Sequence, residues 1–306
     1  MRYNNFSAWL KQRYPGKVKK VCIDGGFTCP NRDGSCGTGG CIFCGERGAG
    51  DHIEFADSSV AEQVAGFLKR HPEADSFIAY FQSFSNTYAP VDVLKRRYDA
   101  AVIDGRTAAL AVATRPDCIN AENADLLASY KSRCDVWVEL GLQTSNEQTA
   151  RLINRGYPLS EFERAVRLLG ERDIPVVVHI MAGLPSETAE TFAETVRYLG
   201  RFRISGIKLH SLYVMKNTAL ERIYKEGSYT PLTRSEYARL AADALTHIRP
   251  EVVIHRLVGS CTPDLLVSPE WVSDKDRALE EINRILESED LAQGCFCDIP
   301  DVRLKY

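Results

Sequence analysis

Five of the ten cysteines in this 306-residue chain lie in one glycine-rich stretch, VCIDGGFTCPNRDGSCGTGGCIFCG. They are Cys22, Cys29, Cys36, Cys41 and Cys44, and the last two form a C-x-x-C pair. Two thiolates at this spacing can bind one metal centre. The stretch is therefore the first candidate for chemistry in this chain.

Three kinds of cysteine chemistry are open at this point. A tetrahedral zinc site normally uses two C-x-x-C pairs, or one pair with two histidines. This chain has no second C-x-x-C, and the nearest histidine, His52, stands alone. A thioredoxin-like redox pair would open a helix after a strand, which GTGGCIFCGERG does not resemble. Three thiolates and a non-protein fourth ligand would suit a [4Fe–4S] cluster with one open iron.

The overall composition is that of an ordinary globular protein. Hydrophobic residues make up 44% of the chain, charged residues 26%, and the formal net charge is −3, which excludes an acidic or basic tail. No apolar run reaches the roughly 18 residues of a membrane-spanning helix, and no signal peptide is visible. We expect a cytoplasmic protein without membrane association, whose clustered cysteines bind metal or catalyse. The scattered cysteines are interpreted as small buried side chains (Cys118, Cys134, Cys261) or tail residues (Cys295, Cys297).

Short apolar runs alternate with helical patterns along the first two thirds of the chain. Strands are predicted over 18–24, 76–82, 107–114, 135–142, 174–181 and 204–214. Helices are predicted over 58–70, 91–102, 123–131, 159–172 and 186–202. In the last helix, Ser186 is placed to cap the first turn. This α/β alternation predicts a parallel sheet with helical crossovers, and both an open doubly wound sheet and a partial (β/α) barrel fit it.

The chain becomes mainly helical after residue 215. The predicted elements there are a helix over 233–248, a strand over 251–258 and a helix over 274–288. We expect three parts: an N-terminal segment over 1–17, a core over 18–215, and an extension over 216–306 packed on that core. The last residues, GCFCDIPDVRLKY, are expected to form a loosely held tail.

Several longer phrases of the sequence resemble the radical S-adenosylmethionine (SAM) superfamily. They are IDGGFTCPNRDG…GGCIFC (23–44), YFQSFSNTYAP (80–90), ATRPDC (113–118), VELGLQT (138–144), NRGY (154–157) and HIMAGLP (179–185). The match is to the branch containing the Elongator catalytic subunit and, more closely, to the bacterial YhcC/YtqA/MnmL-type family. The resemblance implies a partial (β/α)6 TIM-like barrel of parallel strands with a C-terminal helical extension. It also implies an enzyme that uses a [4Fe–4S] cluster and SAM.

The same resemblance assigns the cluster ligands. Cys29, Cys41 and Cys44 would each bind one iron, and the fourth iron would take the amino and carboxylate groups of SAM. Reductive cleavage of SAM would give a 5′-deoxyadenosyl radical. Cys36 lies outside the family pattern and is interpreted first as a spare thiol, with an alternative ligand or a site of damage as the other interpretations. The glycines expected to give the loop its positive φ angles and close backbone approach are Gly34, Gly37, Gly39 and Gly40.

Further residues are expected to contact SAM, although outside this family context each would be an ordinary structural residue. Phe43 would pack beside the adenine, Gln143 and Arg155 would hold the ribose and the carboxylate, and His179 would contact the nucleoside. Many relatives bind the SAM amino group with a glutamate, where this chain has Ala113. The polar residues expected to replace that glutamate are Ser83, Ser85, Asn86 and Thr87.

One carboxylate is predicted inside the barrel. Glu139 shares its strand face with Gln143, because side chains alternate along a strand. A buried carboxylate requires a partner, so we expect it to pair with Lys208 or His210. Glu139 and His210 are therefore candidate catalytic residues, and the simpler interpretation is an internal ion pair.

The substrate is the least determined part. The Elongator-like branch acts on the wobble uridine of tRNA, and the MnmL-type resemblance implies conversion of a carboxymethylaminomethyl group toward aminomethyl. Basic residues with interleaved tyrosines over 11–20 and 94–98 could contact tRNA phosphates, or form an ordinary solvated surface. An electron donor such as flavodoxin or ferredoxin is an expected partner. Two alternatives stay open: a radical SAM enzyme acting on a small metabolite or peptide, and a zinc-loop RNA-binding or regulatory module.

Overall fold

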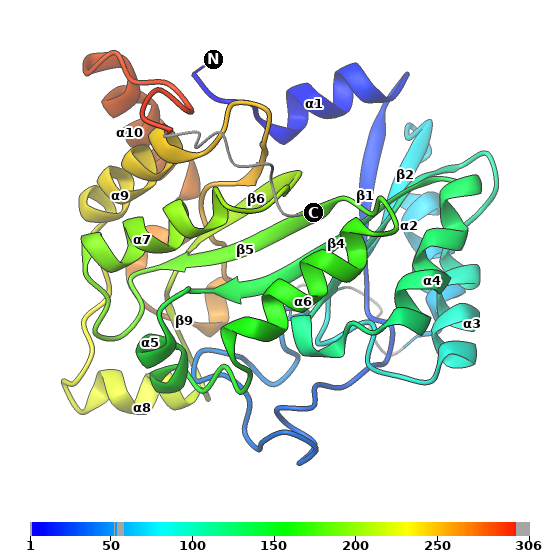
Figure 1. The fold of residues 1–306 in the computed structure, drawn as a ribbon, viewed down its shortest axis with the longest axis horizontal. Coiled ribbons are helices and arrows are strands. Elements are labelled where there is room, and N and C mark those ends of the chain that lie inside the picture. The colour runs from blue at the N-terminus through cyan, green and yellow to red at the C-terminus, as the bar shows by residue number, and fades with distance from the viewer. Residues whose placement is uncertain (1, 52, 54–57, 298–306) are drawn as a thin grey trace.

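A single curved sheet forms the centre of the protein (Figure 1). The computed structural model describes residues 2–51, 53 and 58–297. Seven strands pair in parallel in the order β1-β2-β3-β4-β5-β6-β8. Their bounds are β1 Val18–Ile23, β2 Ser76–Phe81, β3 Thr107–Thr114, β4 Asp135–Gln143, β5 Val176–Ala182, β6 Gly206–Ser211 and β8 Val253–Arg256. Because each strand pairs with the next one along the chain, all crossovers run the same way, and the predicted partial barrel is confirmed.

Helices connect the strands and cover the outer side of the sheet, as α6 and α7 do in Figure 1. The helices that follow β1 to β8 are α2 Val60–Arg70, α3 Val91–Ala101, α4 Ala121–Ser129, α5 Glu147–Leu152, α6 Leu159–Gly170, α7 Ala189–Leu199, α8 Ala219–Lys225, α9 Arg234–His247 and α10 Lys275–Ser288. All predicted strands and helices are present within a few residues of their expected bounds. The strand expected over 204–214 is β6 followed by the short β7 (Val214–Met215).

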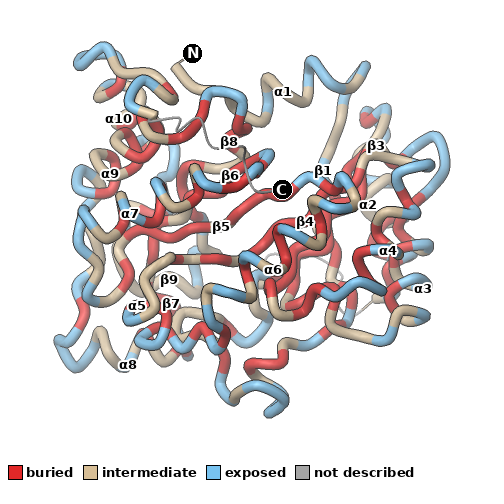
Figure 2. Tube along the Cα trace, viewed as in Figure 1, coloured by how far each residue is buried: buried red, intermediate tan, exposed pale blue. Residues whose placement is uncertain are grey.

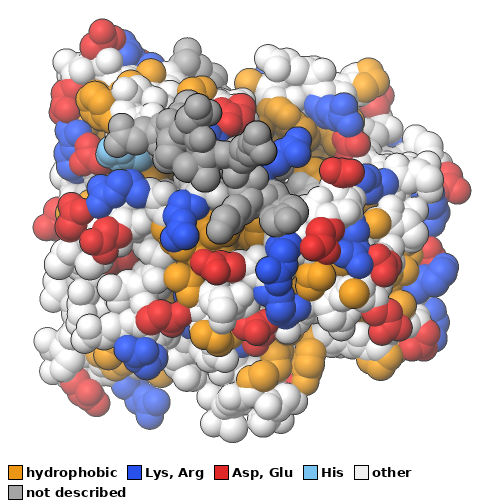
Figure 3. Space-filling model, viewed as in Figure 1, with side chains coloured by type: hydrophobic (Ala, Val, Ile, Leu, Met, Phe, Trp, Pro, Cys, Tyr) orange, Lys and Arg blue, Asp and Glu red, His pale blue; other side chains and the backbone are white. Residues whose placement is uncertain are grey.

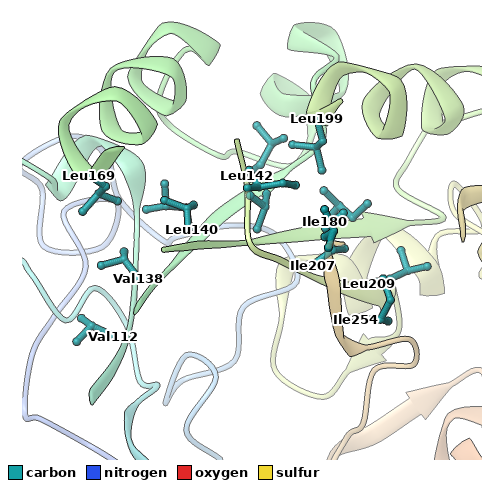
Figure 4. Close-up of a cluster of buried hydrophobic side chains, with 14 of the residues drawn as sticks. Val112, Val138, Leu140, Leu142, Leu169, Ile180, Leu199, Ile207, Leu209 and Ile254 are labelled. Carbon is teal, nitrogen blue, oxygen red and sulfur yellow. The ribbon is translucent and has the colours of Figure 1, made fainter. Parts of the chain in front are cut away.

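The outer side of the sheet carries the main hydrophobic core. On β4, Val138, Leu140 and Leu142 pack in one cluster with Leu169 of α6 and Leu199 of α7, as Figure 4 shows. All five side chains are buried, and each contributes roughly 1.5–3 kcal/mol relative to exposure. Because strand side chains alternate, this packing turns the odd-numbered residues of β4 toward the inside of the barrel.

The strands are buried on both sides, and Figure 2 shows this along most of β4 and β5. Double burial explains why their sequences are almost continuously apolar. The inner side nevertheless holds buried polar side chains, namely Tyr80 of β2, Glu139 of β4 and Lys208 of β6. Buried charges such as those of Glu139 and Lys208 are costly unless they are paired. We therefore expect the functional site on the inner side of the sheet.

The N-terminal segment contains a helix that the sequence analysis did not predict. Helix α1 (Phe6–Arg13) packs on the inner side of the sheet. Phe6 stacks on His255 of β8 with ring centroids 4.2 Å apart and also contacts Trp137. Figure 1 places α1 and the long loop after β1 at opposite ends of the sheet. Helix α1 therefore closes the end of the barrel that lies away from the cysteines.

The sheet continues into the C-terminal part of the chain. Strand β8 pairs with β6, beyond residue 215, where the core was expected to end. A second, antiparallel sheet forms between β7 and β9 (Leu266–Ser268). Gly294 and Phe296 are hydrogen-bonded to α9: the Gly294 N–H donates to the carbonyl of Leu245 at 3.0 Å, and the Phe296 N–H to the carbonyl of Thr246 at 2.9 Å. The remainder of the predicted tail, 298–306, lies outside the described residues.

The start of helix α7 differs from the prediction. Thr188 caps the helix by accepting a hydrogen bond from the Thr191 N–H, so the expectation that Ser186 is the cap was wrong. Ser186 instead has a left-handed φ of +61° in the turn before the cap. The neighbouring Glu187 accepts a hydrogen bond from the Gly183 N–H at 2.8 Å and closes this turn. The turn therefore uses residues 183–187, and the helix begins later than its apolar pattern indicated.

The helical face has no concentration of charge of one sign. Figure 3 shows Lys and Arg side chains interspersed with Asp and Glu over the visible part of this face. Among the described helices, none has both the length and the hydropathy that crossing a bilayer requires.

Candidate active site

A cavity of about 280 Å³ lies inside the barrel at the carboxyl ends of the strands. Loops at this end of parallel α/β folds are the usual place for ligand sites. The lining residues on which the following arguments depend are Cys29, Cys41, Cys44, Glu139, Lys208 and Arg256. The cavity thus joins the cysteine loop to the buried charges of the inner sheet.

The cysteine loop is held in place by hydrogen bonds to the loop before α6. Asn31 Nδ2 donates to the carbonyl of Asn154 at 2.7 Å, and Asn154 Nδ2 donates to the carbonyl of Gly40 at 2.7 Å. Within the loop, the Arg32 guanidinium donates to the carbonyl of Cys44 at 2.8 Å. These contacts tie the cysteine loop to the loop before α6 through protein groups.

Glycines allow this loop to close on itself, as predicted. Gly34, Gly39 and Gly40 have φ between +76° and +92°, a region that other residues rarely adopt. A Cβ at Gly40 would also lie 2.8 Å from Arg32 Nε, and a Cβ at Gly37 would clash with Asn31 Oδ1. The expected combination of positive φ and close backbone approach is therefore present.

Burial favours the protonated form of two thiols of the loop, Cys41 and Cys44. Cys29, Cys41 and Cys44 are free thiols. Burial, together with the nearby Cys44, raises the pKa of Cys41 to about 12, and burial also raises the pKa of Cys44. Metal binding requires thiolates, so loading the site must release protons. Cys36 is exposed and is not among the cavity-lining residues.

The residues expected to contact SAM fall into two groups. Phe43, Ser85 and Gln143 line the cavity, and the buried Oγ of Ser85 has no hydrogen-bond partner in the described part of the chain. Asn86 and Thr87 do not line it: Asn86 Nδ2 donates to the Ala113 carbonyl at 2.8 Å, and Thr87 Oγ1 donates to the Cys118 carbonyl at 2.9 Å. Their side chains join β3 to the loop after β2. Of the four polar residues expected to replace the family glutamate, only Ser85 is among the described lining residues, while the buried Ser83 Oγ and Asn86 Oδ1 lie outside the lining without a hydrogen-bond partner in the described part of the chain.

Arg155 is 1% exposed and borders the cavity. Its guanidinium donates to the carbonyls of Leu142, Thr144 and Tyr157 at 2.7–3.2 Å, and it pairs with Glu147 at 3.3 Å. All of its N–H groups are directed at protein acceptors. The open bidentate fork expected for a carboxylate is therefore not available on Arg155 in this arrangement, and the side chain braces the loop after β4.

Glu139 is the centre of the buried polar network. It is 2% exposed, and its Oε2 accepts hydrogen bonds from Tyr80 Oη at 2.8 Å and from Lys208 Nζ. His179 Nε2 contacts the same oxygen at 2.7 Å, and Trp137 Nε1 donates to Oε1 at 3.2 Å. The predicted ion pair with Lys208 is confirmed, while the second partner is His179 and not His210.

The network is charged at its centre and neutral around it. Burial opposes ionisation of Glu139, but the Lys208 charge and the His179 hydrogen bond outweigh it and hold the pKa of Glu139 well below its usual range. Burial lowers the pKa of Lys208 to about 7 against the attraction of Glu139. Burial likewise lowers the pKa values of His179 and His210. Both histidines are therefore neutral near pH 7, and each can donate one N–H.

Sequence reasoning missed several cavity residues. Arg115 lines the cavity, stacks over Tyr157 and forms a two-point ion pair with Asp117 at 2.7 and 3.0 Å. Its phrase ATRPDC was part of the family match, which was the available signal. Cys261 also lines the cavity, so its interpretation as a buried core residue was wrong. Arg256 had no signal, because nothing in EVVIHRLV indicates which side of its strand it faces.

Comparison with known proteins identifies the class of this site. Residues 32–199 match the model of the radical SAM superfamily, and residues 204–288 match the radical SAM C-terminal domain. The chain is 37% identical to the protein YtqA of Bacillus subtilis, covering 96% of this chain and 92% of the relative. It is 33% identical to the tRNA uridine(34) acetyltransferase of Dehalococcoides mccartyi, covering 63% of this chain and 40% of that protein.

A solved structure shares the fold. The archaeal Elp3 of Methanocaldococcus infernus superposes with a TM-score of 0.68 at 17% identity, covering 91% of this chain and 64% of that structure. Fold, site and sequence together define an iron–sulfur enzyme that acts on SAM. The chain belongs to the radical SAM superfamily, in the group that contains YtqA.

The cysteine loop fits the cofactors of this superfamily, a [4Fe–4S] cluster and SAM. Three free thiols line one cavity, and thiolates are the usual ligands of iron–sulfur clusters. Among the described residues, no group of three or more His, Cys, Asp or Glu side chains converges as a single ion would require. A cluster needs no such convergence, because each thiolate bonds a different iron.

Proposed function

We propose that Cys29, Cys41 and Cys44 bind three irons of the cluster, and that SAM occupies the adjoining cavity. When bound, these two groups supply a carbon-centred radical that abstracts a hydrogen atom from the substrate. The protein's part is to position the cofactors and the substrate and to exclude water. The observation that carries this assignment is the presence of three thiols on a prearranged loop facing one cavity.

Side chains around the cavity would orient SAM. Phe43 would pack against the adenine, and Gln143, at the end of β4, would hydrogen-bond the ribose. His179 is fixed by its 2.7 Å contact with Glu139, which leaves its other ring nitrogen for the nucleoside. The unpartnered Ser85 Oγ supports a role in holding the amino group. Arg155 would support SAM binding indirectly, by holding the loop after β4 in place.

The substrate we propose is the wobble uridine of tRNA, whose carboxymethylaminomethyl side chain would be converted toward aminomethyl. The match to an enzyme named for uridine 34 of tRNA supports this class of substrate. A nucleotide extruded from the anticodon could enter the open end of the cavity. Single-stranded loops are the usual targets of specific RNA recognition, since their bases can leave the stack.

The predicted basic clusters give this proposal little support. Arg13 pairs with Asp135 at 2.8 Å, and Arg96 pairs with Asp92 at 2.6 Å. Lys17 and Lys19 both lie within 3.6 Å of Glu73. Paired surface charges of this kind are typical of a solvated surface. Contacts with tRNA would therefore concentrate at the mouth of the cavity.

The decisive experiment is nucleoside mass spectrometry of tRNA from cells with and without the gene. Loss of the gene should raise the carboxymethylaminomethyl form and lower the aminomethyl form of the wobble uridine. Purified enzyme, with SAM and an electron donor such as flavodoxin or ferredoxin, should restore the wild-type ratio. An unchanged nucleoside profile would refute the tRNA substrate and favour a small metabolite or a peptide.

A second measurement separates the enzyme from a zinc-loop RNA-binding or regulatory module. Protein prepared without oxygen should be brown and should release 5′-deoxyadenosine from SAM when reduced. A colourless zinc protein without SAM turnover would refute the cluster assignment.

A further inference from the structure

Among the described residues that line the cavity, one cation has no hydrogen-bond or ion-pair partner. Five basic side chains line it, and four of them are occupied by protein acceptors. The occupied ones are Arg32 with the Cys44 and Gly45 carbonyls, Arg115 with Asp117, Arg155 with Glu147, and Lys208 with Glu139. Within residues 2–51, 53 and 58–297, the fifth, Arg256, has neither a hydrogen bond nor an ion pair.

A strand irregularity directs Arg256 into the cavity. Ile254, two residues earlier on β8, packs in the outer core, so regular alternation would turn Arg256 outward as well. The register shifts at this point: Ile207 pairs with Ile254, but Lys208 pairs with Arg256. The extra residue reverses the alternation, which is how bulges redirect side chains beside functional sites. Arg256 therefore lies next to Lys208, on the inner side of the sheet.

A second unpartnered polar group lies in the same part of the cavity. His210 follows Lys208 by two residues on β6 and lines the cavity. Its Nε2 is buried and has no hydrogen-bond partner in the described part of the chain. A buried polar atom without a partner costs about 1–3 kcal/mol. Arg256 and His210 thus present a cation and a hydrogen-bond donor that the described protein groups leave unused.

The local charge balance favours an anion. Glu139 is already saturated by Lys208, His179, Tyr80 and Trp137. Lys20 of β1 adds a further positive charge, with Nζ 5.1 Å from the centre of the Tyr80 ring. Lys208, Arg256 and Lys20 therefore lie around Glu139, and the other carboxylate among the described residues of the cavity lining, Asp51, is itself engaged in an interaction. A ligand carboxylate would supply the missing negative charge.

We propose that Arg256 and His210 form a binding subsite for a carboxylate group of the substrate. Two parallel N–H groups of the arginine match the two oxygens of a carboxylate, and His210 Nε2 can donate to one of them. The subsite rests on the proposed function, because the carboxymethylaminomethyl side chain ends in a carboxylate. It predicts that recognition depends on this carboxylate, so the aminomethyl product would lose a contact that the starting nucleoside has.

The test uses a small probe in place of tRNA. N-benzylglycine presents the same –CH₂–NH–CH₂–COO⁻ group on an aromatic ring, and its amide, N-benzylglycinamide, lacks the charge. Calorimetric titration of the SAM-bound holoenzyme, under anaerobic conditions, should show tighter binding of the acid than of the amide. R256Q should weaken binding of the acid by about 10- to 100-fold, the range expected for a lost charged hydrogen bond. Binding of the amide should not change.

The matched control is R284Q, since the Arg284 side chain is 75% exposed on α10. This variant should bind both probes like the wild type, and H210F should weaken binding of the acid. Equal affinity of R256Q and wild type for N-benzylglycine would overturn the subsite, as would failure of the acid to bind the wild type.

Two further titrations identify the source of the anion. Weakened SAM binding by R256Q would show that Arg256 holds the carboxylate of SAM, and would overturn the assignment to substrate. Inorganic phosphate competing with the acid at equal affinity would indicate a nucleic-acid phosphate instead. Because the probe needs no tRNA, loss of acid binding in R256Q would support the subsite even if the tRNA nucleosides proved unchanged.

Discussion

Removal of the Lys208 charge tests whether the network around Glu139 is a true buried ion pair. In K208M the methionine keeps most of the lysine stem, so the packing volume changes little. Glu139 would stay buried, and Tyr80, Trp137 and His179 would still contact it. The change therefore isolates the charge of Lys208 from its bulk.

The expected cost follows from the burial of both partners. Glu139 is 2% and Lys208 4% exposed, and breaking a buried pair by removing one partner costs about 3–5 kcal/mol. His179 offsets part of this loss, because its pKa is held down by burial and, in part, by Lys208. Without Lys208 that pKa rises, and a protonated His179 replaces the missing cation. The replacement is available at low pH and disappears as pH rises through the raised pKa, whereas Lys208 itself is charged only below its pKa of about 7. The loss of stability should therefore be about 3 kcal/mol or more near pH 6.5, where Lys208 is still charged, and smaller near pH 5.

The double variant E139Q/K208M separates charge from structure. Replacing both members of a buried pair by neutral groups is often close to neutral for stability. We expect the double variant to lie within about 1 kcal/mol of wild type, and so to be more stable than K208M. Urea unfolding followed by far-UV circular dichroism at pH 5 and pH 6.5 would measure all three proteins. A loss below about 1 kcal/mol for K208M at pH 6.5, or a double variant less stable than K208M, would refute the buried-pair reasoning.

Two further changes test the cysteine loop and the turn after β5. C41A should lack both the visible absorbance of the cluster and the release of 5′-deoxyadenosine. C36A should keep both, because Cys36 is exposed and outside the cavity. Retention of the cluster in C41A would contradict the ligand assignment. Burial raises the pKa of Glu187 to about 7 against two backbone hydrogen bonds, so the wild type loses stability as pH rises from about 4.5 to 7, and E187Q removes this loss. The free energy of unfolding of E187Q minus that of wild type should therefore be about 2–3 kcal/mol larger at pH 8 than at pH 4.5, as measured by urea unfolding. The same difference between the two proteins at both pH values would contradict the assignment.

The sequence predicted the elements of this fold well, because those signals are local. Apolar runs of strand length and amphipathic helical periods lie within single segments, and a parallel sheet follows from their order. The sequence predicted six strands for this sheet, and the structure adds β8 as a seventh. The cysteine loop was equally visible, since its three candidate ligands lie within 16 positions of one another. Its glycines at 34, 39 and 40 adopt the positive φ angles that the composition of the loop indicated.

Other features depend on contacts between distant segments. Helix α1 was not predicted, since its aromatic residues pack on β4 and β8, more than 120 positions away. The sequence could not show whether the Arg155 guanidinium has N–H groups free to bind a carboxylate, because its hydrogen-bond partners are set by the fold of the loop after β4. Asn86 and Thr87 were predicted to contact SAM, and only the structure shows that Asn86 Nδ2 and Thr87 Oγ1 donate to backbone carbonyls of neighbouring segments.

The amino-acid sequence by itself determined the order of strands and helices and the chemistry of the cysteine loop, because periodicity and motif spacing are properties of short stretches. The tertiary structure alone decided which polar side chains face the cavity and which of them are already paired. Arg256 shows the reason most clearly: a one-residue register shift between β6 and β8 reverses its direction, and such a shift arises only when two strands pair.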